Sequence, residues 1–86
     1  MNFRLSKHVE TELRLRGIPP QFLDQVMANP QQVVPERGNK KAYQSQMDFG
    51  SGKLFLLRAI VDDTISPAVV VTVYRTAKID KYWRKT

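Results

Sequence analysis

The first eighteen residues place apolar side chains at helical spacing. Ser6 is a suitable N-cap for a helix and Gly17 a suitable residue to end it. Between them Val9 and Leu13 recur four residues apart, and Arg16 continues the same face. The pattern therefore predicts a short amphipathic helix that ends near Gly17.

A second helix is expected directly afterwards. Pro19-Pro20 suits its start, because proline is tolerated in the first helical turn. Asn29-Pro30 suits its end, since the residue before a proline disfavours helical geometry. The predicted buried stripe consists of Phe22, Val26 and either Leu23 or Met27.

From residue 31 onward the pattern is typical of strands. A short extended run covers Gln32 to Val34, and residues 43–49 alternate between apolar and polar, which predicts a half-exposed strand. Leu54 to Val61 is apolar at every position except Arg58, which predicts a central strand covered on both faces. Residues 68–74 are the most β-branched segment and predict a last strand with Val71 buried.

These elements predict one α+β domain over residues 1–86. Strands that follow one another through short turns pair antiparallel, so we expect two N-terminal helices packed on a four-stranded antiparallel sheet. Ile79, Tyr82 and Trp83 have helical spacing and predict a short C-terminal helix. Trp83 is expected to anchor the core, with base stacking as the alternative.

The excess of basic residues predicts the class of partner that the protein binds. The chain has 14 Lys and Arg against 8 Asp and Glu, a formal net charge of +6, and five of the basic residues fall in the last twelve positions. This bias predicts affinity for a phosphate backbone or an acidic protein segment. The alternative is a solvated face that only keeps the protein soluble.

Several kinds of site are disfavoured. One histidine and no cysteine argue against a zinc site, and neither a Gly-rich phosphate loop nor a nucleotide fingerprint is present, so we expect no metal and no cofactor. No apolar run is long enough for a signal peptide or a membrane span. Together with the lack of cysteine, this predicts a cytoplasmic protein without membrane contact.

Three residues are the candidates for catalysis. His8 lies near the positive end of the first helix, a place that favours a neutral imidazole able to act as a base, although it would also suit a surface histidine bonded to Glu12. Arg58 is a cation in an apolar strand, so it must reach the open face of the sheet or pair with an acid. Tyr74 can stack on a base, or it can cap the core.

The candidates for RNA binding are basic residues around Tyr74 and in the tail. An aromatic ring among cations is typical of single-stranded RNA platforms. Arg16 is added because its guanidinium can reach beyond the apolar stripe of the first helix. The predicted RNA-binding residues are Arg16, Arg75, Lys78, Lys81 and Arg84.

An ordered set of short motifs resembles a known family. Ser6-Lys7-His8, Arg16-Gly17-Ile18, Asn29-Pro30, the segment from Val71 to Thr76, and Lys78 with Tyr82-Trp83 resemble the family catalogued as domain of unknown function 4258. The likeness spans nearly the whole chain. Glu12 and Ala77 depart from it, because family members often carry a basic residue and a serine there.

This resemblance implies a fold and a function. The family is similar to the RelE/ParE-like superfamily of bacterial toxins, with BrnT-type toxins among its relatives. These are basic proteins with two helices on an antiparallel sheet, typically metal-independent ribonucleases neutralised by a small antitoxin. The implied function is a type II toxin acting as an endoribonuclease on mRNA, either single-stranded or on the ribosome.

Two alternatives to that function remain. The protein can be a non-catalytic module that binds RNA or a partner protein, or a ParE-like toxin that inhibits a protein target. If it is a ribonuclease, His8 or Tyr74 would handle the protons. Arg58, Arg75 and Lys78 would then hold the phosphate.

Overall fold

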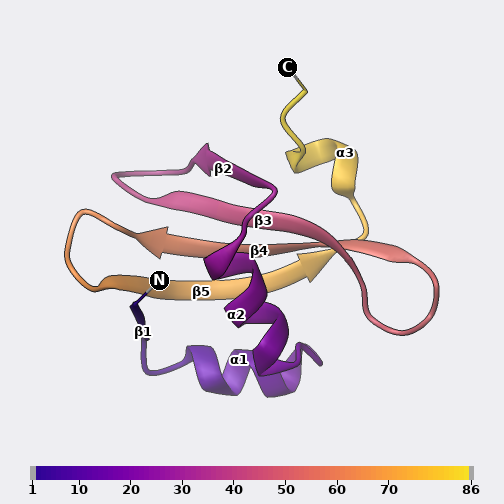
Figure 1. The fold of residues 1–86 in the computed structure, drawn as a ribbon, viewed down its shortest axis with the longest axis horizontal. Coiled ribbons are helices and arrows are strands. Elements are labelled where there is room, and N and C mark those ends of the chain that lie inside the picture. The colour runs from indigo at the N-terminus through magenta and orange to yellow at the C-terminus, as the bar shows by residue number, and fades with distance from the viewer. Residues whose placement is uncertain (1, 86) are drawn as a thin grey trace.

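The computed structural model describes residues 2–85, which form three helices and a five-stranded sheet (Figure 1). In chain order the elements are β1 (Phe3–Leu5), α1 (Val9–Leu15), α2 (Pro20–Ala28), β2 (Gln32–Pro35), β3 (Lys41–Asp48), β4 (Leu54–Asp62), β5 (Ala68–Thr76) and α3 (Ile79–Tyr82). Across the sheet the strands are ordered β1-β5-β4-β3-β2. The α+β class is therefore confirmed.

The expected four-stranded antiparallel sheet is correct only in part. Strands β2 to β5 pair antiparallel in sequence, but β1 adds a fifth strand that runs parallel to the start of β5, with Phe3 opposite Ala68. The sheet is mixed. β1 was missed because three residues are too few to show an alternating pattern.

The first helix ends where the sequence predicts and begins later. Gly17 has φ +62°, and the amides of Gly17 and Ile18 donate to the carbonyls of Arg14 and Leu13 in a Schellman motif. The predicted cap at Ser6 is wrong, because α1 begins at Val9. The Ser6 hydroxyl instead donates to the β5 carbonyl of Val71 at 3.1 Å, which ties the start of the helix to the sheet.

The second helix follows its prediction closely. It runs from Pro20 to Ala28 with Asn29 as its C-cap. Its buried residues are Leu23, Val26 and Met27. Phe22 is half-buried and meets the edge of Phe49 with 5.0 Å between ring centroids.

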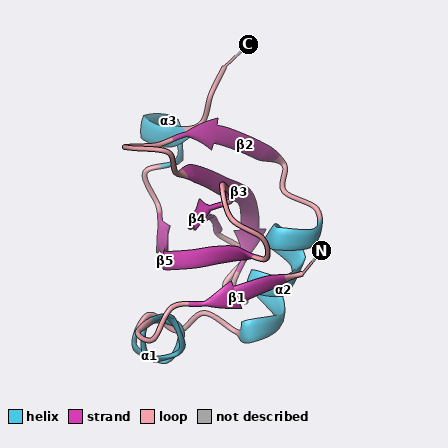
Figure 2. Cartoon of the chain, turned by 90° about the vertical axis from the view of Figure 1, so that its left-hand side faces the viewer, coloured by secondary structure: helices cyan, strands magenta, loops and turns pink. Residues whose placement is uncertain are grey.

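The sheet is covered on both faces. Figure 2 shows α2 and α3 on opposite sides of it. On the α2 face, Leu57 and Ala59 of β4 belong to the main core with residues of α1 and α2. On the other face, Ile60 packs with Val34 and Ala42 in a second, smaller cluster. The apolar run of β4, interrupted only by Arg58 between Leu54 and Val61, thus reflects a strand at the centre of the sheet, as predicted.

Two burial predictions are wrong. β3 is not half-exposed, because Ala42 to Ser45 are all buried and Gln44 is 0% exposed under the C-terminal segment. Val71 is only half-buried, because a register shift opposite Ile60 and Val61 changes the alternation of β5. Val70 and Val73 fill the core in its place.

Candidate functional site

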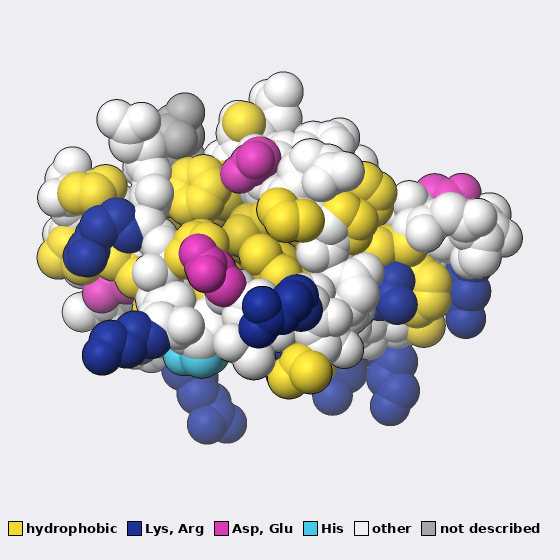
Figure 3. Space-filling view, turned by 90° about the horizontal axis from the view of Figure 1, so that it is seen from below, with side chains coloured by type: hydrophobic (Ala, Val, Ile, Leu, Met, Phe, Trp, Pro, Cys, Tyr) yellow, Lys and Arg dark blue, Asp and Glu magenta, His cyan; other side chains and the backbone are white. Residues whose placement is uncertain are grey.

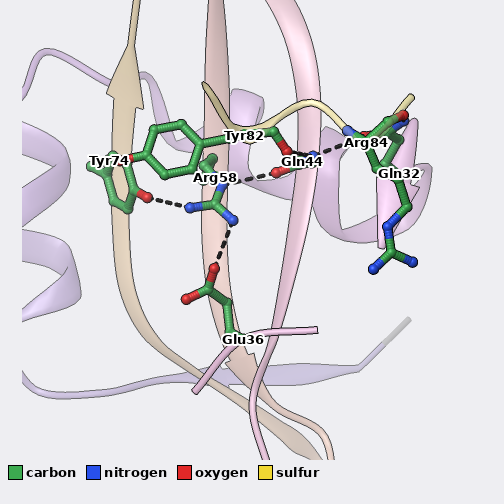
Figure 4. Close-up of polar contacts among 7 residues, drawn as sticks. All are labelled: Gln32, Glu36, Gln44, Arg58, Tyr74, Tyr82 and Arg84. Atoms are coloured by element: carbon green, nitrogen blue, oxygen red, sulfur yellow. Dashed lines mark hydrogen bonds and ion pairs between the residues drawn. The ribbon is translucent and has the colours of Figure 1, made fainter. Parts of the chain in front are cut away.

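Arg58 lies at the centre of a polar cluster on the α3 face of the sheet (Figure 4). Its side chain is 3% exposed, and three of its nitrogens donate to side chains of other segments. Nε donates to Gln44 Oε1 at 2.8 Å and Nη2 to Glu36 Oε1 at 2.9 Å, while Nη1 donates to the Tyr74 hydroxyl. The buried charge is therefore both paired and hydrogen-bonded, as its burial requires.

The same cluster holds the C-terminal segment on the sheet. The ring of Tyr82 lies against the Arg58 guanidinium, with 4.2 Å from its central carbon to the ring centroid. Gln44 Nε2 donates to the Tyr82 carbonyl at 3.2 Å. Gln32 exchanges two hydrogen bonds with the backbone of Arg84, at 2.7 and 3.1 Å (Figure 4). The position of α3 thus depends on Arg58 and its neighbours.

This setting bears on two of the predicted catalytic residues. Burial raises the pKa of Tyr74, and the hydrogen bond and charge of Arg58 partly oppose that rise. The phenol consequently keeps its proton near neutral pH. A phosphate could reach the Arg58 guanidinium only if Glu36 or the C-terminal segment moved away.

His8 lies elsewhere, beside the outer edge of β5. Its side chain is 62% exposed, and its Nε2 is 3.8 Å from Glu12 Oε1. Arg16 Nη2 approaches the other oxygen of the same carboxylate at 3.6 Å. Glu12 accepts a hydrogen bond from the Thr72 hydroxyl at 2.8 Å and one from the Val73 amide at 3.3 Å. This carboxylate thus covers a strand edge that β1 leaves unpaired.

The three predicted catalytic residues do not share one set of contacts. Tyr74 and Arg58 are hydrogen-bonded to each other, as part of the cluster under α3. Within residues 2–85, no hydrogen bond or ion pair connects His8 to either of them. The structure joins His8 to Arg16 instead, through Glu12.

Arg75 has a different environment from Arg58. Its guanidinium carbon lies 4.6 Å from the centroid of Phe49 and 5.0 Å from that of Phe55, on the face opposite Tyr74. Its Nη2 passes close to Gly17, where a side-chain carbon would stand 3.7 Å away. Among the described residues it has no carboxylate within 4.0 Å and no hydrogen-bond acceptor.

The remaining predicted RNA-binding residues are exposed in the C-terminal segment. Lys78 and Lys81 line an open groove of about 580 Å³ beside α3, together with Gln46 and Trp83. The side chain of Arg84 is exposed, and its backbone is held by Gln32. Trp83 is half-buried and belongs to neither core cluster, which contradicts its predicted role as a core anchor.

Sequence reasoning missed the partners of Arg58. Glu36 lies in a polar segment that shows no regular pattern, and Gln44 is one of the alternating polar positions that predict a half-exposed strand. The pairing of Gln44 could have been inferred from the sequence. A β3–β4 hairpin that turns at Gly50-Ser51-Gly52 places Gln44 directly opposite Arg58. An arginine in an apolar strand requires such a cross-strand partner.

Most of the positive charge has no acidic partner. Within residues 2–85, only Arg16, Lys41 and Arg58 lie within 4.0 Å of a carboxylate, out of 14 Lys and Arg. Figure 3 shows basic side chains projecting at several places around the underside of the molecule. Such unpaired cations attract a polyanion over a broad surface.

Within the described residues neither a group of metal ligands nor a related protein indicates a function. In the segment from Asn2 to Lys85, no three His, Asp or Glu side chains are grouped as ligands, and no helix is long and apolar enough to cross a membrane. Comparison with protein-family models, curated proteins and solved structures gives no match.

Proposed function

We propose that the protein binds single-stranded RNA through the end of the sheet that carries Arg75. The observation that supports this most is the environment of half-buried Arg75, whose guanidinium lies against the rings of Phe49 and Phe55 and has no acceptor among the described residues. Arginine presents five donors in a planar fork that matches a phosphate. The two rings hold that fork in place at the surface, so little side-chain freedom is lost when a phosphate binds.

Neighbouring side chains support a polynucleotide rather than a single anion. Lys53 Nζ lies 5.3 Å from the centroid of Phe55, a ring that Arg75 also contacts. Lys78 follows the end of β5 only three residues after Arg75. Several cations spaced along one end of a sheet suit a chain of phosphates, and the partly exposed rings beside them suit unpaired bases.

The biological setting that we propose is a type II toxin–antitoxin system. The motif resemblance supports a RelE/ParE-like toxin in the cytoplasm, paired with a small antitoxin protein. The order of two helices followed by four antiparallel strands supports the same proposal. An acidic antitoxin segment would cover the same unpaired cations that attract RNA.

RNA affinity as a function of salt tests the proposal. For a single strand, log affinity should fall linearly with log salt concentration, by about 0.7 per phosphate contact. Arg75→Ala should weaken binding and flatten the slope, whereas Arg37→Ala removes an exposed charge from the β2–β3 loop and should change both little. A parent protein with a slope near zero would overturn the proposal.

A second candidate function is metal-independent RNA cleavage. The observation that favours it is the exposed imidazole of His8 beside the Glu12 carboxylate, since a carboxylate can orient a histidine for proton transfer. The separation of His8 from the Tyr74–Arg58 pair favours binding without chemistry. A ParE-like toxin, the third candidate, would arrest growth while cellular RNA stays intact.

A further inference from the structure

The groove beside α3 combines an aromatic ring with two cations. It has a volume of about 580 Å³, within the usual range of ligand sites of about 300–1,000 Å³. Trp83 lines it with Lys78 and Lys81 from the C-terminal segment and Gln46 from β3. Asp80 is the only acid among the lining residues, so the groove carries a net positive charge.

The backbone beside Trp83 is held on both sides. Its amide donates to the Ile79 carbonyl at 2.8 Å, which closes the turn of α3. The preceding residue, Tyr82, packs on Arg58, and the following residue, Arg84, is paired with Gln32. The backbone that carries the indole is therefore fixed beside the groove before any ligand arrives, which lowers the entropic cost of stacking on it.

We propose that this groove binds one nucleotide of single-stranded RNA, with the base stacked on Trp83 and the phosphates facing Lys78 and Lys81. The Gln46 side chain can donate to and accept from a base edge. This inference rests on the proposed function and adds a base contact to the phosphate contact at Arg75. Because the groove and Arg75 flank the same end of β5, one strand of RNA would pass around that end.

The fluorescence of the protein gives a direct test, because Trp83 is its single tryptophan. Titration with an oligouridine of about ten nucleotides, a length within the range of single-strand sites, should quench the emission as the base stacks on the indole. An abasic oligomer with the same number of phosphates should bind through charge but leave the emission nearly unchanged. This comparison uses the unmodified protein, so it does not depend on any variant folding.

Two variants complete the experiment. Trp83→Leu should weaken oligouridine binding about tenfold to a hundredfold, as loss of a stacked base does, and should leave abasic binding unaltered. Trp83→Phe keeps an aromatic ring and should lose less affinity for oligouridine than Trp83→Leu does. Circular dichroism of both variants reports whether the fold is kept.

The outcomes separate the two proposals. If oligouridine and the abasic oligomer quench equally, or if Trp83→Leu binds oligouridine like the parent, the groove is not a base site, although RNA binding at Arg75 stands. If neither oligomer binds at any salt concentration, both proposals fail together.

Discussion

Tyr74 and Arg75 are adjacent in the chain and point to opposite faces of the sheet. Tyr74 pairs in register with Arg58 and accepts its hydrogen bond under α3. Arg75 pairs in register with Leu57 and lies against Phe49 and Phe55 on the side of α2. The predicted platform of one aromatic ring beside one cation is therefore divided between a cluster under α3 and a half-buried cluster on the opposite face.

This division predicts that stability and RNA binding can be changed separately. Tyr74→Phe removes the acceptor of a buried guanidinium donor and should lower the free energy of unfolding by about 1–2 kcal/mol, with RNA affinity unchanged. Arg75→Ala should weaken RNA binding and should lower the free energy of unfolding by less than Tyr74→Phe does. Urea denaturation and RNA titration of both variants measure the two effects. Equal loss of affinity in both would show that Tyr74 also contacts RNA.

The Arg58 cluster should be essential for stability. Arg58→Ala leaves the Oε1 atom of Gln44, a residue that is 0% exposed, without its donor and removes the cation on which Tyr82 packs. Loss of one partner from a buried polar network costs about 3–5 kcal/mol, and the low end applies because Glu36 can turn to water. Urea denaturation measures this loss. The emission of Trp83 should also shift to the red as α3 detaches.

Arg37→Ala is the matched control for that experiment. Arg37 follows Glu36 in the chain but is exposed, so its loss should change stability by less than about 0.5 kcal/mol. If Arg58→Ala were as stable as this control, the cluster would contribute little to folding and α3 would be held by other contacts.

The helices and central strands could be predicted because their signals are local. Gly17 marks the end of α1 since only a left-handed residue completes its Schellman motif, and Pro20 marks the start of α2. The apolar run around Leu57 is a direct consequence of burial on both faces. Such features depend on residues only a few positions apart, so they can be recognised in the sequence.

The candidate site could not be predicted in the same way, because its contacts join distant segments. Glu36 reaches Arg58 across 22 residues, and Glu12 reaches Thr72 across 60. No spacing rule links such pairs until strand register is known. However, successive side chains of a strand point to opposite faces of the sheet, so the sequence alone predicts that Tyr74 and Arg75 lie on different faces.

Glu12 should stabilise the fold by covering the free edge of β5. Glu12→Ala leaves the Thr72 hydroxyl and the Val73 amide without their acceptor and should cost about 1–2 kcal/mol. Glu10→Ala removes an equal charge from the exposed side of the first turn of α1 and should cost less than half as much. Thermal denaturation compares the two variants, and equal melting temperatures would contradict a specific role of Glu12 at the strand edge.

The last prediction separates RNA binding from RNA cleavage, and it concerns His8. If the parent protein cleaves RNA in the presence of a metal chelator, proton transfer by His8 should be responsible, and His8→Ala should lose about 10²–10⁴-fold in rate while keeping its salt-dependent RNA affinity. Lys7→Ala is the matched control, because Lys7 is the exposed neighbour of His8 and is not placed to transfer a proton. Gel analysis of a defined RNA gives the rates. A parent that leaves RNA intact at high protein concentration supports binding without chemistry. A parent and a His8→Ala variant that cleave equally would move the acid–base role to Tyr74, whose hydroxyl accepts from Arg58 and still carries a proton.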